Sequence, residues 1–575
     1  MNQKAFVFVA LLAMIVGWTA CRLSGKTGLP PGDADNGGLV MNPGFEAVVL
    51  VDSLQGAARH IAVNDNGDLY VKLRFPQKDG GNAAIRDNDN DGKADEVVRF
   101  GEYEDKTSYG TAMRVHKGYL YFSSVTRVFR QKLTGDLVPT SEIETIVIDT
   151  QPPLQHDAKP IAFDNEGHIY VPFGAPSDCC QVSDRAPGSP GMFPCTLLDL
   201  RGGIWQFDEN KTGQYQKDGV KYATGLRSVV ALAWNEQDNN LFTAAHGRDY
   251  LHPTWPKVFT EWQGSVLPSE EFLRLKPGAN VGWPYYYYDQ IQKKKFLNPE
   301  YGGDGKKQGG ADTVTQPVMG FPGHFAPNDL LFYKGNQFPA RYKQGAFIAF
   351  HGSTSSAPYA QAGYFIAFVP FKNGSPAGDW EVFADGFAGI DTVRNVSDAK
   401  YRPMGLAEGP DGSLYVAETE KGKIWRIMYK GDSTFGEAQL TAMAKRKLTA
   451  PNTKQPDEVK DNLDPGFSTP EAASYNIYCG VCHQRNGMGD GRFPPLVESE
   501  WVKGDPTVAI NIVLRGMEGN ITVKGKTYNN RMPGWGWLSD EVIAETLTYV
   551  RTHFNNESAV TPAQVAEARQ KLKKK

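Results

Sequence analysis

Apolar and polar residues follow one unit that recurs along residues 45–430. Each copy has an apolar stretch, a turn rich in Asp, Asn and Gly, and a second stretch of strand-forming residues. The clear copies are 61–71, 161–171, 232–243 and 406–416, with looser copies at 113–122 and 346–352. A turn between two alternating segments predicts a β-hairpin, and repeated hairpins predict a β-propeller. The length favours six blades with long loops, and a set of unrelated β-sandwiches is the alternative.

Residues 466–555 show a helical pattern instead. Apolar residues at helical spacing predict a helix over 539–551, with Ser539 as its N-cap. The sequence therefore predicts an all-β propeller followed by a small all-α domain. Residues 431–465 are interpreted as a linker with a short helix at 436–448, and residues 556–575 as a solvated, charged tail.

An apolar run at residues 5–18 matches the core of a signal peptide and is short for a membrane-spanning helix. Small residues then precede Cys21, an order that resembles a bacterial lipobox, although Trp18 departs from the usual Leu. We expect residues 1–21 to be a lipoprotein-type signal peptide, with a lipid anchor on Cys21 at the periplasmic side of a membrane. Residues 22–44 would be a tether. An ordinary signal peptide cut nearby is the alternative.

Composition and charge narrow the class of protein. The 575 residues include 61 Lys and Arg and 65 Asp and Glu, for a formal net charge of −4. This balance argues against a nucleic acid partner, which requires a basic surface. Frequent Gly (61) and Pro (37) favour short strands and turns. No stretch reaches the roughly 18 apolar residues of a membrane span, which argues against a channel or transporter.

The strongest motif lies at residues 479–483, which read Cys-Gly-Val-Cys-His. Cys-x-x-Cys-His is the attachment signal for c-type haem. Cys479 and Cys482 would bind the haem covalently, and His483 would be the proximal iron ligand. A chance match and a redox Cys-x-x-Cys pair are the alternatives.

The order of features over residues 466–555 resembles the class I cytochrome c family. In that family a Met in the loop before the last helix is the sixth iron ligand, which the resemblance assigns to Met532. Met488 lies too close to the attachment motif, and Met517 is less suitably placed. A His/Met pair closes both axial positions and favours electron transfer over oxygen chemistry.

Three further cysteines lie within the predicted propeller. In an exported, oxidising location we expect a disulfide from Cys195 to Cys179 or to Cys180. A vicinal bridge between Cys179 and Cys180 is the alternative, and a reactive catalytic cysteine is a weaker one.

Short motifs spread over residues 45–430 are individually weak and specific as a set. They read ARHIA at 58–62, HDAK at 156–159, TGLR at 224–227, GRD at 247–249, GWP at 282–284, FPGHFAP at 321–327, AFIAFHGS at 346–353 and RPMG at 402–405. Together they resemble the soluble glucose/sorbosone dehydrogenase family, which includes the quinone-dependent pyranose dehydrogenases.

This resemblance implies a six-bladed propeller that holds pyrroloquinoline quinone (PQQ) on its top face. Because PQQ carries three carboxylates, its site needs cations; the residues implied are Arg59, Lys159, Arg227, Arg248, His351 and Arg402. Surface ion pairing is the alternative for the arginines. Gly247 and Asp249 match the place of a Ca²⁺ that polarises the quinone. His156 matches the general base that takes the sugar hydroxyl proton, and a structural loop histidine is the alternative.

Four positions depart from the family pattern. Ser228 stands where Asn is common, Thr354-Ser355 where Trp-Asn is common, and Lys159 where Arg is frequent. The sequence therefore does not name the sugar.

A separate acidic loop covers residues 87–95. Its first, third, fifth and ninth residues are Asp87, Asp89, Asp91 and Asp95, and its sixth is Gly92, as in the start of a Ca²⁺ loop. The Glu of an EF-hand is missing, since Val98 occupies its position. The pattern predicts a free-standing structural Ca²⁺ loop, with a solvated acidic turn as the alternative.

Two functions fit these features. The first is an exported quinohaemoprotein dehydrogenase that oxidises a sugar or polyol at PQQ and passes electrons through haem c to a respiratory acceptor. The second is an electron-transfer lipoprotein whose propeller only binds carbohydrate or protein.

Overall fold

The computed structural model describes residues 28–104, 110–152, 155–431, 436–453, 455–456, 469–489 and 491–573. The predicted signal peptide with Cys21 lies outside these ranges, as do residues 22–27 of the tether and part of the linker.

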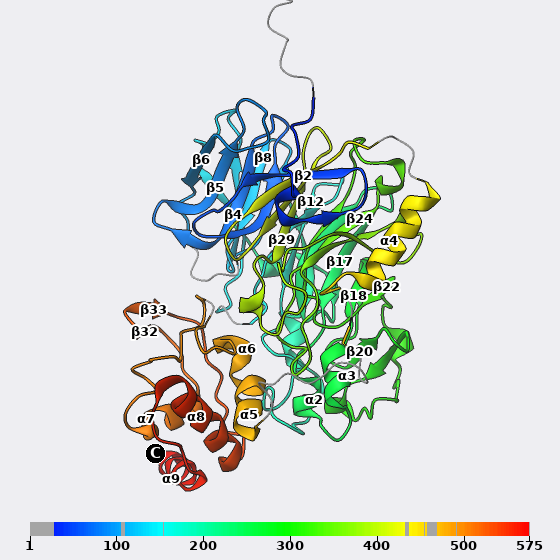
Figure 1. Cartoon of the computed structure of the whole chain (residues 1–575). Coiled ribbons are helices and arrows are strands. Elements are labelled where there is room, and N and C mark those ends of the chain that lie inside the picture. Colours follow the sequence, from blue (N-terminus) through cyan, green and yellow to red (C-terminus); the bar gives the residue numbers. More distant parts are fainter. Residues whose placement is uncertain are drawn as a thin grey trace, which may run out of the picture.

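Six sheets of four or five strands form the larger part of the described chain (Figure 1). The first blade contains β3 (Ala58–Val63), β4 (Leu69–Gln77), β5 (Gly80–Arg86) and β6 (Glu96–Phe100), and the second contains β7 (Met113–His116), β8 (Tyr119–Ser123), β9 (Arg127–Lys132), β10 (Ile143–Ile148) and β14 (Gln214–Tyr215). The third contains β11 (Ala162–Phe163), β12 (His168–Phe173), β13 (Gly203–Asp208), β15 (Val220–Thr224) and β19 (Ala279–Asn280), and the fourth contains β16 (Ser228–Asn235), β17 (Asn240–His246), β18 (Glu270–Leu275) and β22 (Met319–Phe321). The fifth contains β23 (Pro327–Phe332), β24 (Ala346–Phe350), β25 (Phe365–Val369), β28 (Glu381–Asp385) and β1 (Val40–Met41), and the sixth contains β29 (Pro403–Glu408), β30 (Leu414–Glu418), β31 (Ile424–Tyr429) and β2 (Phe45–Val51). This is a six-bladed β-propeller, as the sequence predicted.

The first long strand closes the ring. β2 pairs with β31, so that Phe45 lies opposite Tyr429 and the last blade contains both ends of the propeller. The pairing removes one exposed sheet edge, because the N-terminal strand completes the C-terminal blade.

The repeats of the sequence are the innermost hairpins of the blades. Ile61 pairs with Val71, Leu232 with Thr243 and Leu406 with Val416, which are the first and last residues of three repeats. The looser copy at 113–122 is the hairpin of β7 and β8. The copy at 346–352 begins with a second strand, β24, because β23 comes before it.

Smaller elements decorate the propeller loops. They are β20 (Tyr286–Asp289) with β21 (Lys294–Leu297), β26 (Phe371–Lys372) with β27 (Ser375–Pro376), α2 (Leu251–Thr254) and α3 (Glu261–Val266). The two helices lie on the side of the propeller that faces the C-terminal domain (Figure 1).

The C-terminal domain is mainly helical. It contains α5 (Pro470–Tyr478), α6 (Gly480–His483), α7 (Pro506–Arg515), α8 (Asp540–Asn555) and α9 (Pro562–Lys573), with a hairpin of β32 (Ile521–Val523) and β33 (Lys526–Tyr528). Ser539 is the N-cap of α8 as predicted, and its hydroxyl accepts a hydrogen bond from the Val542 N–H.

The expectation of a solvated C-terminal tail is wrong. Val565 and Ala568 of α9 are buried in the core of the C-terminal domain. Arg569 pairs with Asp540 at 2.8 Å and donates to the carbonyl of Leu538. The apolar face of α9 therefore extends the helical core, and Lys571 is exposed.

The linker is fastened to the propeller. It forms the predicted helix, α4 (Glu437–Thr449), whose Arg446 bonds Asp385 and the carbonyl of Phe383 on β28. Further along, Trp262 of α3 donates to the carbonyl of Pro456 at 3.1 Å. The described part of the linker thus follows the propeller wall toward α3.

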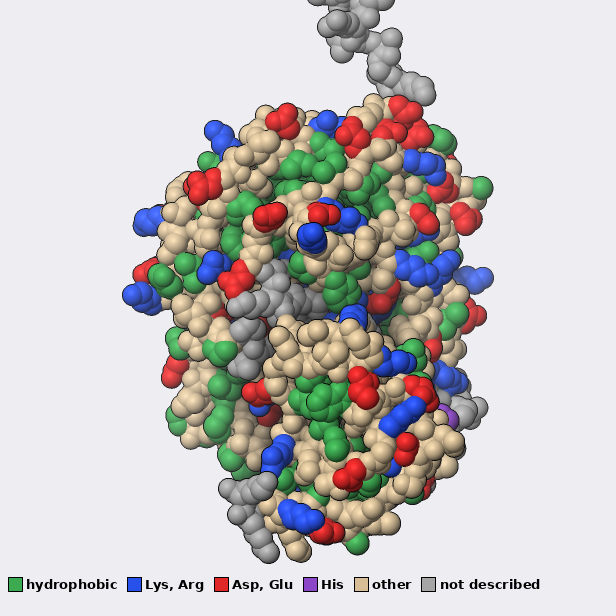
Figure 2. Space-filling model, turned by 90° about the vertical axis from the view of Figure 1, so that its left-hand side faces the viewer, with side chains coloured by type: hydrophobic (Ala, Val, Ile, Leu, Met, Phe, Trp, Pro, Cys, Tyr) green, Lys and Arg blue, Asp and Glu red, His purple; other side chains and the backbone are tan. Residues whose placement is uncertain are grey.

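The described surface shows no feature of a membrane span. On the face drawn in Figure 2, basic and acidic side chains are interspersed. No helix among the described residues combines the length and apolar character needed to cross a bilayer.

Candidate active site

The inner strands bring residues from different blades together at one end of the ring. Arg59 is the second residue of β3, Arg227 directly precedes β16 and Arg402 directly precedes β29. Blades that are not neighbours in the ring also meet here: His60 of the first blade lies 2.7 Å from the carbonyl of Asn328, at the start of β23 in the fifth blade. Three of the predicted cofactor residues therefore sit at the same end of the propeller, its top face.

His156 is held as a neutral base on this face. Its ring Nδ1 lies 2.6 Å from the Ala175 carbonyl and donates to it, which leaves the lone pair on Nε2. Burial, and next the positive charge of Arg227, lower the pKa of His156 to about 3. Gly174 permits this approach, because a Cβ there would lie 1.8 Å from the His156 carbonyl oxygen. The imidazole is thus unprotonated over the physiological pH range and can accept a proton.

Beside His156 lies a network of paired charges, which we call the blade 3–4 cluster: Asp178, Arg185, Arg227 and Asp249. Arg227 pairs with Asp178 at 2.5 Å and with Asp249 at 2.7 Å, and Arg185 also pairs with Asp178. The arginines hold the pKa values of both carboxyls below their usual range against the effect of burial. Each cation in this cluster therefore faces at least one full negative charge.

Two groups of predicted residues meet in that cluster. Arg227, predicted to bind PQQ, donates to the carbonyl of Gly247 and pairs with Asp249, both predicted Ca²⁺ ligands. A cavity of about 40 Å³ is lined by Arg227, Gly247, Arg248 and Trp283. It has room for an ion or a water and not for a quinone.

A second group, the blade 6–1 cluster, consists of Arg59, Arg74, Arg402 and His351. Arg402 donates to the carbonyls of His351 (3.1 Å) and Gly352 (2.6 Å), and its ion pair with Glu420 is longer, at 3.5 Å. Burial and then the charges of the three arginines hold the pKa of His351 well below its usual range. This cluster gathers three buried guanidinium groups around a neutral imidazole.

Lys159 and Arg248 bind carboxylates of their own. The Lys159 ammonium lies 2.9 Å from Asp149, and Arg248 lies 2.7 Å from both oxygens of Glu300. All four side chains are buried. Contact of either cation with a cofactor would require it to share or leave its carboxylate. Arg248 borders the blade 3–4 cluster, because it lines the same cavity as Arg227 and donates to the carbonyl of Asp249 at 3.3 Å.

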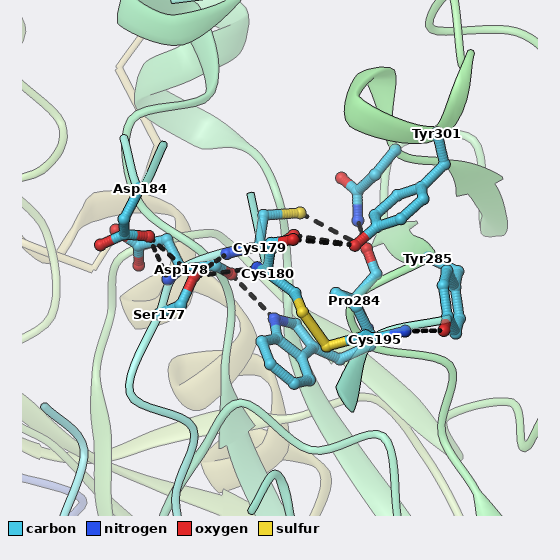
Figure 3. The surroundings of a disulfide bond; sticks show 11 residues. Ser177, Asp178, Cys179, Cys180, Asp184, Cys195, Pro284, Tyr285 and Tyr301 are labelled. Atoms are coloured by element: carbon cyan, nitrogen blue, oxygen red, sulfur yellow. Dashed lines mark hydrogen bonds between the residues drawn. A yellow bond between two sulfur atoms is a disulfide. The ribbon is translucent and has the colours of Figure 1, made fainter. Parts of the chain in front are cut away.

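A disulfide fixes the loop that carries Asp178 and Arg185 (Figure 3). Cys180 is joined to Cys195, one of the two pairings left open by the sequence, and Cys179 remains a buried thiol. The Trp283 indole donates to the Asp178 carbonyl at 2.8 Å. Burial raises the pKa of Cys179 well above its usual range, so it is no ready nucleophile.

The haem attachment motif has the geometry that c-type haem requires. Cys479 is the N-cap of α6, Cys482 lies within that helix and His483 ends it, and both cysteines carry thiols. The His483 Nδ1 donates to the carbonyl of Pro494 at 2.9 Å, which fixes the ring and leaves Nε2 for an iron. Gly489 allows the glycine-rich loop to fold back, since a Cβ there would lie 2.1 Å from the Phe493 carbonyl oxygen.

Met532 lies in the loop before α8, where the resemblance expected the sixth ligand. It forms an isolated bridge with Met517, with N···O distances of 2.9 Å in both directions, and packs against the helical core. Met488 is 53% exposed, so Met532 is the better buried of these two candidates.

The acidic loop brings together three of its four predicted ligands. Carboxylate oxygens of Asp87, Asp89 and Asp95 lie within 4.8 Å of one another. The carboxylate of Asp91 instead accepts a hydrogen bond from the Lys93 N–H. The three grouped oxygens suit a hard cation.

Sequence reasoning missed Asp178, Arg185 and Tyr250. Asp178 and Arg185 belong to no motif, and their nearness to the Cys179-Cys180 pair was the available signal. Tyr250 directly follows the motif at 247–249 and reaches the C-terminal domain, a contact considered below.

Known proteins resemble the two parts of the chain separately. The TrAA12-like family model matches residues 39–430. The PQQ domain of a pyranose dehydrogenase from Coprinopsis cinerea is 16% identical, with a TM-score of 0.55, over 69% of this chain and 98% of that one. A calcium structure of an AA12-family enzyme from Trichoderma reesei is 17% identical, with a TM-score of 0.55, over 70% and 99% of the two chains.

The C-terminal part has closer relatives. Cytochrome c-552 of Thermus thermophilus is 36% identical over 102 residues, which cover 69% of that protein. A match that extends beyond the C-terminal part is to an uncharacterized protein of Borreliella burgdorferi, which is 26% identical over 210 residues; these make up 36% of this chain and about half (48%) of that protein. The chain therefore belongs to the TrAA12-like family of PQQ-dependent pyranose dehydrogenase propellers, here joined to a class I cytochrome c domain.

Proposed function

We propose that this chain is an exported quinohaemoprotein dehydrogenase that oxidises a sugar or polyol and delivers the electrons through haem c to a respiratory acceptor. The observation that carries the proposal is the neutral imidazole of His156, which lies beside the buried arginines of the blade 3–4 cluster. A base and cations on one face suit removal of a hydroxyl proton next to an anionic cofactor.

The donor set fits PQQ. Bound PQQ would supply the acceptor for the substrate's hydride. Arg402 would hold a carboxylate together with Arg59, since the two shorter hydrogen bonds of Arg402 go to backbone carbonyls and its ion pair with Glu420 is longer. The buried Nε of Arg227 has no hydrogen-bond partner among the described residues. His156 would take the hydroxyl proton at Nε2, and the blade 3–4 cluster would keep the imidazole in place.

The C-terminal donors fit haem c. Cys479 and Cys482 would form the thioether bonds, and His483 and Met532 would be the axial ligands. With both axial positions filled, the iron exchanges electrons rather than binding oxygen. A one-electron outlet of this kind suits an enzyme whose substrate loses two electrons.

Several finer features belong to the same proposal. Ca²⁺ would bind near Gly247 and Asp249, and a second Ca²⁺ would bind Asp87, Asp89 and Asp95. Export, and a lipid on Cys21, would place the enzyme at the periplasmic side of a membrane. Two similar proteins support this chemistry, since one is a pyranose dehydrogenase PQQ domain and another was solved with calcium.

One observation favours the alternative of a non-catalytic binding propeller. Lys159, Arg227 and Arg248 are already paired with carboxylates. A cluster whose charges are internally satisfied needs no anionic cofactor.

The test is reconstitution of the haem-loaded protein with PQQ and Ca²⁺, followed by dye reduction with a panel of aldoses and polyols. The proposal expects saturable quinone binding and dye reduction that depends on one sugar class. Absence of both would leave the binding propeller with an electron-transfer domain. Met532→Ala should remove the Fe–S charge-transfer band, and an unchanged band would contradict that ligand.

A further inference from the structure

The cytochrome domain contacts the top face of the propeller at two separate places. The ring of Tyr250 lies 6.4 Å from that of Trp535, in an edge-on arrangement. On the other side, a Cβ at Gly491 would lie 3.6 Å from the Phe75 ring. The domain thus reaches both clusters, because Tyr250 follows Asp249 and Phe75 follows Arg74.

Tyr250 is held firmly on the propeller side. It has a left-handed backbone (φ +57°), which is costly for a bulky residue and persists only where neighbours enforce it. Its carbonyl accepts hydrogen bonds from the Thr254 N–H (3.0 Å) and hydroxyl (2.5 Å). The preceding Asp249 is bound to Arg227. The site residues therefore determine where this ring points.

A continuous line of contacts runs from the site to the cytochrome. The guanidinium of Arg185 lies 5.1 Å from the centre of the Tyr250 ring, and Arg185 and Arg227 share Asp178. On the far side of the ring, Trp535 is 6% exposed and packs with Tyr478, the residue before Cys479.

The haem-bearing side of the cytochrome faces this contact. The Trp535 ring lies 5.7 Å from that of Tyr478, which precedes the haem-binding Cys479, and burial raises the pKa of the Tyr250 phenol. The phenol therefore keeps its proton, and its aromatic ring rather than an ionised oxygen makes the bridge. Trp535 also lies in the loop that carries Met532, the expected iron ligand.

We propose that the contact between Tyr250 and Trp535 docks the cytochrome on the top face and is the place where electrons leave the propeller for the haem. The inference rests on the proposed dehydrogenase function and adds the residues of the exit. Oxidation of one C–OH group to C=O releases two electrons and two protons. Each haem iron takes one electron, ferric to ferrous, so two passages occur per substrate, with an external one-electron acceptor reoxidising the haem between them. The protons leave to water.

The test compares Tyr250→Leu, Tyr250→Phe and Trp535→Leu with Tyr215→Leu, a matched control on the exposed strand β14. In PQQ-loaded protein without oxygen, sugar-driven haem reduction is followed by stopped flow, and direct reduction of a small dye at the propeller is followed separately. We expect Tyr250→Leu and Trp535→Leu to slow haem reduction by at least about tenfold, equivalent to about 1.4 kcal/mol in the barrier. Dye reduction should stay within about twofold, and Tyr250→Phe and Tyr215→Leu should resemble the wild type.

A second measurement needs no quinone or substrate. Small-angle X-ray scattering of the haem-loaded variants reports whether the two domains separate, and the visible spectrum reports the haem ligands. We expect Tyr250→Leu to expand the molecule with an unchanged haem spectrum, and Tyr250→Phe to remain compact.

Three results would overturn the inference. The first is haem reduction by Tyr250→Leu at the wild-type rate. The second is a loss of dye reduction in Tyr250→Leu that equals its loss of haem reduction. The third is identical small-angle scattering for Tyr250→Leu and Tyr250→Phe. Failure of the dehydrogenase proposal looks different: the wild type then reduces no dye with any sugar, and the scattering result alone decides whether Tyr250 docks the cytochrome.

Discussion

The two arginine clusters on the top face use their charges differently. In the blade 3–4 cluster, Arg227 and Arg185 pair with the carboxylates of Asp178 and Asp249. In the blade 6–1 cluster, the shorter bonds of Arg402 go to backbone carbonyls. A carbonyl satisfies a guanidinium N–H without cancelling its charge, whereas a carboxylate does both. The first cluster therefore builds a rigid seat for His156, and the second offers positive charge to an anionic ligand.

The largest expected effect is at the blade 3–4 cluster, which holds His156. His156→Gln keeps a side chain of similar polarity and removes the basic nitrogen, so sugar-dependent dye reduction should fall by about 10²–10⁴-fold. The haem spectrum should not change. Turnover close to the wild type would show that the base lies elsewhere.

Asp178→Asn tests whether the same cluster is structural. It leaves Arg185 and Arg227 buried beside a neutral amide, and breaking one member of a buried ionic network costs about 3–5 kcal/mol. Denaturant unfolding of the variant should show this loss of propeller stability. Asp208→Asn, on the partly exposed end of β13, is the control with little expected change. Equal stability of the two variants would contradict a structural role for the blade 3–4 cluster.

Arg402→Gln should affect ligand binding more than stability, because it belongs to the other cluster. Loss of one charged hydrogen bond is worth about 1.5–3 kcal/mol, which predicts PQQ affinity weaker by roughly 10- to 100-fold. Equilibrium titration with PQQ measures it, and Arg402→Lys should restore part of the affinity. The difference between the two clusters is contradicted if Arg402→Gln binds PQQ with normal affinity and unfolds at the same denaturant concentration as Asp178→Asn.

The most gradual effect is the pH dependence of stability, which accumulates with each pH unit. Burial lowers the pKa of His156 to about 3 and that of His60 to about 4, whereas unfolded histidines titrate near 6.5. Between these values the unfolded chain binds protons that the folded chain excludes, so stability falls as pH drops from about 6.5 toward 4. Each histidine contributes a slope of at most about 1.4 kcal/mol per pH unit. Unfolding of His156→Gln at several pH values should show a shallower slope, and an identical slope would contradict the neutral buried state.

Local patterns made the architecture predictable. The hairpin repeats could be read because turn residues and strand alternation are encoded within about ten residues. The haem attachment motif is equally local. The prediction of Ser539 as an N-cap depends only on neighbouring residues, and the structure confirms it.

The rest depends on contacts between distant segments. Asp178 pairs with Arg227 across 49 positions of the sequence, and only the loop held by Cys180 and Cys195 brings them together. Tyr250 meets Trp535 because α4 and the following segment run along the propeller. The charged end of α9 suggested a solvated tail. Its buried face has few apolar residues, so it can be identified only once α7 and α8 are seen to pack against it.

The central claim is that oxidation at the propeller feeds the haem of the same chain. The most direct measurement mixes haem-oxidised protein with PQQ, Ca²⁺ and one aldose without oxygen, and follows the reduced haem bands. The account predicts reduction that requires both PQQ and sugar and is lost in His156→Gln. A haem that stays oxidised while PQQ is bound and the dye is reduced would contradict electron transfer between the two domains.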